Sequence, residues 1–223
     1  MPVETILLIL ESVLLIATII LLLYSIKEGK SRKDLLLEVG RATKLLTRQE
    51  YFLAVTDAMT DAKEEIAGFI TGRLPADDDR KRVRDITHSI EKISAGGIRV
   101  KYLMPKFHDR LHIGHLYEKA GAEVRYSMCA IANNIRYIIV DGTVAVIGMP
   151  ENRGEKEATK KGFRIPSEGL SGILKDHFYR CWEESVPYEL YVKEVIQQTG
   201  LTPKLLEKEL QIDAEELEKL LKD

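Results

Sequence analysis

The feature that most constrains the fold is the stretch 134–148, in which two β-branched runs meet at Asp141-Gly142. Asp-Gly between two such runs is among the strongest short-range signals for a tight β-hairpin, because both residues tolerate positive φ angles. Side chains alternate along a strand, so Asn134 and Arg136 share one face, side by side at the start of an otherwise apolar run. The sequence therefore predicts a central hairpin whose first strand opens with two neighbouring polar groups.

Helical and β-branched segments alternate on both sides of this hairpin. Before it we expect helix 48–63, strand 65–72, helix 80–94, strand 98–104, helix 108–119 and strand 122–127, and after it strand 162–165 and helix 167–184. Such alternation predicts an α/β fold in which helices sandwich a mixed, at least partly parallel sheet. Large apolar side chains at helical spacing in the last helix, among them Trp182, are expected to close the core.

The hairpin resembles the signature of the phospholipase D superfamily, His-x-Lys-(x)4-Asp followed by Gly-Ser-x-Asn. The places of its His, Lys, Asp and Gly are taken here by Asn134, Arg136, Asp141 and Gly148. The order of helices and strands over residues 48–186 is similar to one phospholipase D-like half-domain, with the degenerate effector domains of TrmB-type archaeal regulators as the closest form. The resemblance implies a phospholipase D-like mixed sheet, with Asp141, Gly142 and Gly148 in structural roles.

The resemblance also implies a chemistry that the chain has lost in part. In active members a histidine of one half-site attacks phosphorus, a histidine of the other half protonates the leaving oxygen, and lysine and asparagine hold the non-bridging oxygens. Asn134 cannot act as that nucleophile, because the lone pair of its amide nitrogen is delocalised into the carbonyl. Arg136 can still hold an anionic oxygen through its planar fork of donors. Asn152 lies one residue beyond the place of the signature asparagine.

Two interpretations of this altered site remain open. In the first, Asn134, Arg136 and Asn152 line a pocket for an anionic or phosphate-containing ligand without turnover. In the second, Arg136 pairs with a nearby carboxylate such as Asp141 or Glu123 and binds nothing.

Residues 5–26 form an apolar run that would be ~33 Å long as a helix, enough to cross a bilayer core. A transmembrane anchor is favoured over a cleaved signal peptide, because a basic n-region is missing and the run exceeds the usual ~7 to 15 residues. Lys27, Lys30 and further basic residues follow the run, so the positive-inside rule predicts a single pass with the amino terminus outside and a cytoplasmic soluble domain. Glu11 marks either a helix–helix contact or a carboxylate that reaches water at the outer interface.

The chain therefore divides into an anchor with its basic flank (1–33), a juxtamembrane helix (34–47), the phospholipase D-like domain (48–186) and a helical tail (187–223). The tail resembles a minimal helix-turn-helix, but its last helix carries Glu215, Glu216 and Glu218, which phosphate would repel. The formal net charge of −2 also lacks the basic footprint of nucleic-acid binding. Nucleic acid is not the expected partner, and a partner-binding or dimer-supporting bundle is favoured.

Three histidines and two cysteines are the candidate metal ligands of the chain. His108, His112 and His115 share one face of a predicted helix and could ligate zinc, but a solvated or half-buried polar edge is favoured, so no metal or cofactor is expected. Cys129 and Cys181 are the only two cysteines and form no metal-site pattern in the sequence. They are predicted to be buried, free thiols of a reducing compartment.

The favoured hypothesis is a membrane-anchored, non-enzymatic binding, regulatory or scaffolding protein. It would self-associate as a homo-oligomer, because superfamily sites form between two halves and this chain carries one; tethering raises the effective concentration of the copies. One alternative is a phosphodiesterase, either a phospholipase or a nuclease, with a dimeric site and a replacement nucleophile such as His88 or His177. Another is a membrane-bound transcriptional regulator that acts through its C-terminal helices.

Overall fold

The computed structural model describes residues 13–28, 30, 44–73, 80–129, 135–150 and 159–200, with single positions 207, 212, 215, 217 and 218. The chain forms two compact units, Met1–Ala42 and Thr43–Asp223. In the first, residues 13–28 are helical, and large apolar side chains on every side of this helix are exposed. In the described part of the chain, no helix has both the length and the apolar composition needed to span a bilayer. Residues 5–12 of the predicted span, Glu11 included, lie outside the described residues.

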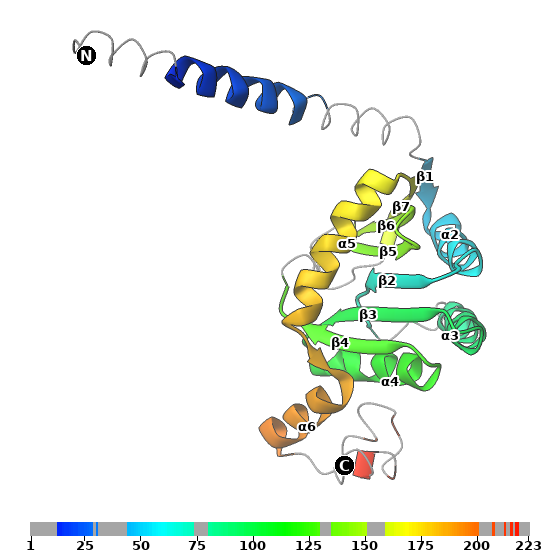
Figure 1. The fold of residues 1–223 in the computed structure, drawn as a ribbon. Coiled ribbons are helices and arrows are strands. Elements are labelled where there is room, and N and C mark those ends of the chain that lie inside the picture. Colours follow the sequence, from blue (N-terminus) through cyan, green and yellow to red (C-terminus); the bar gives the residue numbers. More distant parts are fainter. Residues whose placement is uncertain are drawn as a thin grey trace, which may run out of the picture. The chain divides into compact units, whose positions relative to one another are not determined.

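The described residues of the second unit build an eight-stranded mixed sheet (Figure 1). Its strands are β1 (Lys44–Thr47), β2 (Glu65–Phe69), β3 (Arg99–Pro105), β4 (Glu123–Ser127), β5 (Arg136–Val140), β6 (Val144–Pro150), β7 (Thr159–Pro166) and β8 (Val186–Pro187). They follow the order β1-β7-β6-β5-β2-β3-β4-β8 across the sheet. Strands β2, β3 and β4 are parallel to one another, and the other pairings are antiparallel. The prediction of a mixed, partly parallel sheet is confirmed.

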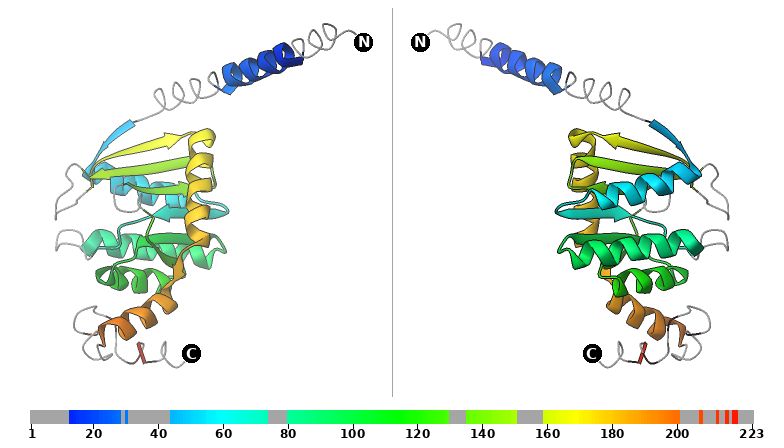
Figure 2. Two further views of the ribbon diagram at one scale, coloured as in Figure 1. Left: turned by 90° about the vertical axis from the view of Figure 1, so that its left-hand side faces the viewer. Right: turned by 90° about the vertical axis from the view of Figure 1, so that its right-hand side faces the viewer.

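Helices lie on both faces of this sheet. They are α2 (Arg48–Thr60), α3 (Arg80–Ala95), α4 (Leu111–Lys119), α5 (Glu168–Glu183) and α6 (Tyr188–Thr199), with the 3-10 turn η2 (His108–Arg110) before α4. Helix α5 stands across the strands (Figure 2) and contacts β6, β5, β2 and β4. Residues of α2, α3, α4 and α6 contribute to the core on one face, and residues of α5 to a second core on the other.

Alternation along β5 separates these two cores as the sequence predicts. Ile138 belongs to the core that α2, α3, α4 and α6 share, whereas Tyr137 and Ile139 belong to the core beneath α5. Phe178 and Trp182 of α5 are buried in this second core. The expected closure of the core by the Trp182 helix is thus confirmed.

The predicted hairpin forms at the expected residues. Asp141 and Gly142 have φ angles of 51° and 69°, as both central positions of a type I′ turn require. The Thr143 N–H donates to the Val140 oxygen at 3.0 Å. Because β5 and β6 are central strands, the hairpin lies in the middle of the sheet.

The juxtamembrane helix predicted over 34–47 is wrong for its last four residues. Residues 44–47 form strand β1, which pairs antiparallel with β7; residues 34–43 lie outside the described part. Thr47 then caps α2, since its hydroxyl accepts from the Glu50 N–H and the Glu50 carboxylate accepts from the Thr47 N–H. Residues 44–47 form a strand despite their local helical pattern, because pairing with β7 satisfies their backbone N–H and C=O groups.

The predicted domain end at residue 186 is also displaced. Strand β8 pairs with β4, so the sheet continues into the segment assigned to a separate tail. Helix α6 buries four side chains in the main core: Tyr188, Tyr191, Val192 and Val195. Gly200 ends α6 in the left-handed conformation, with φ 64°, which is common for a glycine after a helix. Most of the chain after residue 200, including most of the predicted last helix, lies outside the described residues.

Candidate functional site

Arg136 begins β5 at the edge where the parallel strands end. Strand β5 runs antiparallel to β2, and Phe69, the last residue of β2, lies opposite Tyr137. Alternation puts Arg136 on the same face as Ile138, the face that α2 covers, and its side chain is half-buried. Crevices at the carboxyl ends of parallel strands are the usual ligand sites of open α/β sheets.

Two glycines leave room beside Arg136. Gly148 on β6 lies directly opposite Arg136, and Gly162 on β7 lies opposite Gly148. The ring of Tyr51 from α2 occupies the space over Gly162, where a Cβ would meet Tyr51 Cδ2 at 2.5 Å. Burial raises the pKa of Tyr51 to about 12, and the nearby positive charge of Arg136 opposes that rise. A neutral phenol hydroxyl therefore lies in the electrostatic neighbourhood of Arg136.

A second arginine, which the sequence analysis did not single out, lies at the end of the parallel strands. Arg110 in η2 follows β3 and is 5% exposed. It packs beside Gly72, where a Cβ would meet Met104 Sδ at 2.5 Å and Arg110 Cβ at 3.4 Å. Its Nε lies 3.4 Å from Asp109 Oδ1. The carboxyl ends of β2 and β3 thus carry a buried guanidinium in addition to Arg136.

Asp141 lies at the other end of β5. Its carboxylate accepts from the backbone N–H groups of Lys63 at 2.9 Å, Glu64 at 2.9 Å and Glu65 at 3.0 Å. Burial acts to raise the pKa of this carboxyl, but these three donors hold it below its usual value. Asp141 therefore ties the start of β2 to the hairpin turn.

The two carboxylates considered for Arg136 in the sequence have other partners. Asp141 lies five positions after Arg136 in the chain, about 16 Å away along the strand at ~3.3 Å per residue. Glu123 begins β4, and its Oε1 lies 3.4 Å from Arg125 Nε. Asn134 and Asn152, the other members of the predicted anion pocket, lie outside the described residues, so the pocket itself stays a prediction.

The architecture was compared with those of known proteins. No protein-family model matches the chain, and no curated protein is significantly similar to it in sequence. Nuc from Salmonella typhimurium, a phospholipase D family member, matches with a TM-score of 0.51 and 17% identity over 66% of this chain and 97% of Nuc. The fold is phospholipase D-like. NucT from Helicobacter pylori gives a TM-score of 0.50 and 15% identity over 65% of this chain and 98% of NucT. TrmBL2, an archaeal chromatin protein, gives 0.47 and 16% over 74% and 65% of the two chains.

The histidines that the sequence singled out do not converge within this phospholipase D-like fold. His108 lies in η2 and is exposed, whereas His112 and His115 lie on α4. His115 Nδ1 lies 3.2 Å from the Tyr188 hydroxyl. None of these histidines belongs to the cluster of potential metal ligands found among the described residues. His112 and His115 are half-buried.

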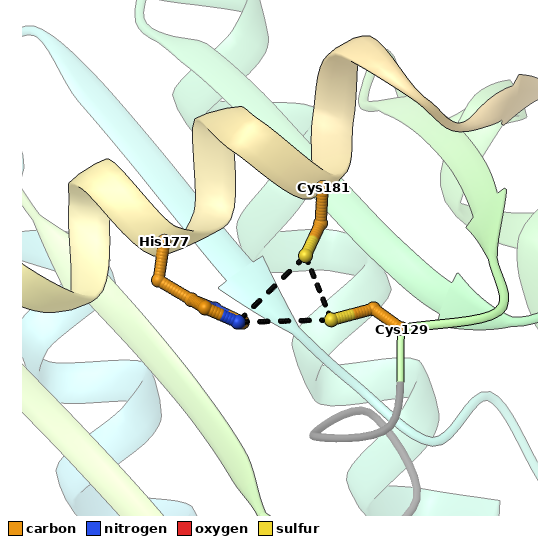
Figure 3. Close-up of side chains that lie close together, drawn as sticks. All are labelled: Cys129, His177 and Cys181. Atoms are coloured by element: carbon orange, nitrogen blue, oxygen red, sulfur yellow. Dashed lines mark hydrogen bonds between the residues drawn. The ribbon is translucent and has the colours of Figure 1, made fainter.

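A different set of donors meets beneath α5 (Figure 3). His177 and Cys181 are one helical turn apart on α5, and Cys129 follows the end of β4. The Nε2 atom of His177 lies 3.7 Å from Cys129 Sγ and 3.8 Å from Cys181 Sγ. The two sulfurs lie 2.7 Å apart, and both cysteines are free and half-buried. Both are free thiols, as predicted, but the prediction that they are buried and isolated is wrong, because they are half-buried and meet at His177.

A tyrosine fixes the orientation of His177. The Tyr137 hydroxyl donates to the Leu174 oxygen at 3.2 Å, and the same hydroxyl lies 3.4 Å from His177 Nδ1. Because the phenol proton goes to the Leu174 oxygen, the arrangement favours the tautomer with the proton on Nδ1, which leaves the lone pair of the ring on Nε2. Burial, with a contribution from Arg180, lowers the pKa of His177. Burial and the neighbouring Cys129 raise the pKa of the Cys181 thiol to about 12.

A buried carboxylate also lies beneath α5. Glu65 is 4% exposed. Its carboxylate lies 3.0 Å from Lys175 Nζ, 3.7 Å from Lys101 Nζ and 3.9 Å from Arg99 Nη2, and the Tyr179 hydroxyl donates to it. Burial acts to raise the pKa of Glu65, but the bonds from Tyr179 and Lys175 hold it below its usual value. Since Lys175 and Tyr179 belong to α5, this network fixes the helix that carries His177 and Cys181.

Proposed function

We propose that the chain is a membrane-anchored phospholipase D-like domain that binds a phosphate-containing anion without hydrolysing it. The observation that carries this proposal is the place of Arg136, half-buried at the carboxyl ends of the parallel strands and near the neutral Tyr51 hydroxyl. A guanidinium stays charged at physiological pH and can give a phosphate two parallel hydrogen bonds. Asn134, at the place of the nucleophile, has no basic lone pair.

The positions of the two candidate replacement nucleophiles support binding without turnover. His88 lies on α3 with its side chain 81% exposed, and its Nδ1 is 3.4 Å from Glu91 Oε2. His177 lies on the α5 face of the sheet, opposite the face of Arg136, and its Nε2 points to two sulfurs. His88 is thus an exposed residue of α3, and His177 lies on the other face of the sheet from Arg136.

The proposal includes a dimer, in which two copies of the chain form the site together. The chain matches nearly the whole length of Nuc, so it supplies one phospholipase D-like unit, and superfamily sites form between two such units. Residues 5–26 would confine the copies to one membrane, with the domain on the cytoplasmic side because the basic residues follow the run. The helix at 13–28, with apolar side chains exposed all around it, supports that role.

We expect the full-length chain to stay in the membrane pellet after alkaline carbonate washing and to enter solution only with detergent. In detergent, light scattering of the purified protein should give the mass of two chains, because each copy supplies one half of the site. A chain that carbonate releases would contradict the anchor, and a monomer at every concentration tested would contradict the pairing.

Replacing Arg136 by Ala should raise the Kd of inorganic phosphate at least ~10-fold, because a hydrogen bond to a charged group contributes about 1.5–3 kcal/mol. Titration calorimetry of the full-length protein in detergent measures this. Arg136→Lys should lose less, since it keeps the charge but not the fork. Arg84→Ala, which removes an exposed arginine of α3, is the matched control and should bind as the unaltered protein does.

The same variants separate binding from catalysis. We expect no release of nitrophenol from bis-para-nitrophenyl phosphate by the unaltered chain. Release that Arg136→Ala abolishes would replace the binding proposal by the phosphodiesterase alternative. Equal phosphate affinities of the Arg136→Ala and Arg84→Ala variants would remove Arg136 from the site.

A further inference from the structure

We propose that Cys129, His177 and Cys181 form a binding site for a thiophilic divalent metal ion of the zinc class. The three side chains come from α5 and from the segment after β4, and their donor atoms all lie within 4.8 Å of one another (Figure 3). The site lies on the α5 face of the sheet, whereas Arg136 lies on the opposite face. It is therefore separate from the proposed anion pocket and does not depend on it.

The distances from the imidazole suit a tetrahedral ion. With Zn–S of about 2.3 Å and Zn–N of about 2.0 Å, tetrahedral ligands lie about 3.5 Å apart for nitrogen to sulfur and about 3.8 Å apart for sulfur to sulfur. The Nε2 atom of His177 lies 3.7 and 3.8 Å from the two sulfurs. The sulfurs themselves, now 2.7 Å apart, have to separate by about 1 Å to bind one ion. Rotation of the Cys129 side chain, which lies outside the helices and strands, can supply that change.

His177 is oriented as a metal ligand. Its Nδ1 lies 3.4 Å from the Tyr137 hydroxyl, whose proton goes to the Leu174 oxygen. This arrangement favours the tautomer with the proton on Nδ1, in which the lone pair of Nε2 faces the two sulfurs. Histidines that bind metals almost always donate their other ring N–H to a fixed acceptor, which sets both the tautomer and the ring plane. Tyr137 is in turn held by its bond to the Leu174 oxygen. Tyr137, a residue of β5, thus holds His177 in position.

Two of the three ligands stand on a rigid element. Phe178 and Trp182 of α5 are buried in the core beneath the helix, and Lys175 of the same helix lies 3.0 Å from the buried Glu65. His177 and Cys181, spaced four residues apart on one helical face, are therefore held in place before any ion binds. The Cys129 N–H donates to the Ser127 hydroxyl at 3.1 Å, which ties the third ligand to the end of β4.

Three protein ligands leave one coordination position. On binding, each thiol gives its proton to solvent and each thiolate donates an electron pair to the ion, while the neutral imidazole donates through Nε2. Among the described residues, no fourth histidine, cysteine or carboxylate joins the cluster. Zinc sites with three protein ligands keep an exchangeable fourth ligand such as water. Cys129 and His177 are half-buried.

A disulfide between Cys129 and Cys181 is the competing use of the two sulfurs. It would join them directly and would require no imidazole. The fixed ring of His177, with its lone pair between the sulfurs, favours the metal instead. The two outcomes differ in thiol content, in metal content and in their dependence on His177.

Titration of the reduced full-length protein in detergent, without an affinity tag, with Co²⁺ and then Zn²⁺ tests the proposal. We expect about one equivalent of Co²⁺ with the thiolate-to-metal charge-transfer and d–d bands of a tetrahedral sulfur site, bleached by Zn²⁺. Cys181→Ser and His177→Gln should each weaken Zn²⁺ binding by at least ~100-fold. His88→Gln, which removes an exposed imidazole of α3, should leave it unchanged.

Tyr137→Phe is a milder test that preserves all three ligands. It removes the hydroxyl that contacts His177 Nδ1 and the Leu174 oxygen, so Zn²⁺ affinity should fall by about 10-fold while the cobalt spectrum keeps its thiolate band. The absence of a thiolate–cobalt band in the reduced protein would overturn the proposal. Zn²⁺ affinity equal in the Cys181→Ser variant and the unaltered protein would overturn it too, as would a Cys129–Cys181 disulfide whose reduction restores no metal binding.

Discussion

Replacing Glu65 by Gln is expected to lower the free energy of unfolding of the unit Thr43–Asp223 by about 3 kcal/mol. The amide keeps the shape of the side chain but removes its charge, and Lys101 and Lys175 then face each other beneath α5 without the carboxylate that they share. Breaking a buried ion pair by removing one partner costs about 3–5 kcal/mol. The lower value applies here because the Lys175 side chain is 37% exposed and can reach water.

Urea denaturation followed by the fluorescence of Trp182 measures this difference, because Trp182 is the only tryptophan and is buried under the same helix. Glu64→Gln is the matched control: it removes the neighbouring carboxylate, which is exposed, and should change stability by no more than about 0.5 kcal/mol. Equal effects of the two substitutions would mean that the network beneath α5 contributes nothing specific to stability.

The effect of Glu65 depends on pH in a defined direction. In the folded protein the pKa of Glu65 is lowered from its usual 4.5, so its contribution is fully present above about pH 4.5 and is lost as pH falls through the lowered pKa. The gap between the unaltered protein and Glu65→Gln should therefore stay constant from about pH 8 to pH 5 and narrow at lower pH. A gap that widens on acidification would contradict this assignment.

The features of the fold that could be predicted are those with local signals. Asp141-Gly142 gives the hairpin because few other residue pairs tolerate two successive positive φ angles, and Gly200 ends α6 for a similar reason. The alternation of Tyr137 and Ile138 on either side of β5 follows from the strand geometry itself. Leu45 and Leu46, in contrast, fit a helix or a strand equally well. Only the free edge of β7, more than a hundred residues away along the chain, decides for the strand.

The candidate sites, too, could be predicted only where the sequence carries a local signal. The signature spacing predicted that Arg136 would begin the central strand, but its neighbour Tyr51 belongs to α2, and its ring lies over Gly162 of β7. His177 and Cys181 carry a visible signal, because residues four apart share one helical face. Cys129, 52 residues before Cys181, carries none. The expected single helix over 108–119 was wrong at its start, since His108 lies in a 3-10 turn and α4 begins at Leu111.

Replacing Asp141 by Ala is expected to lower the free energy of unfolding by about 3 kcal/mol, because three backbone donors lose a charged acceptor. Hydrogen bonds to charged groups contribute about 1.5–3 kcal/mol each, and water can replace some of them at this half-buried site. Alanine is also less tolerant than aspartate of the φ of 51° at this position. The lost hydrogen bonds connect the hairpin turn to the start of β2. The substitution should therefore destabilise the centre of the sheet rather than its edge.

Asp141→Asn separates the charge from the backbone geometry, since asparagine tolerates a positive φ equally well. Its amide oxygen can keep the N–H groups of Glu64 and Glu65, which share Oδ1, but its NH₂ group would meet the Lys63 N–H donor to donor. We therefore expect Asp141→Asn to lower the free energy of unfolding by about half as much as Asp141→Ala does, as measured by urea denaturation at pH 7. Asp61→Asn removes a carboxylate that is 73% exposed and 3.6 Å from Arg164, and should cost under about 1 kcal/mol. If Asp141→Asn were no more destabilising than Asp61→Asn, the signature aspartate would not hold the hairpin to β2 by its charge.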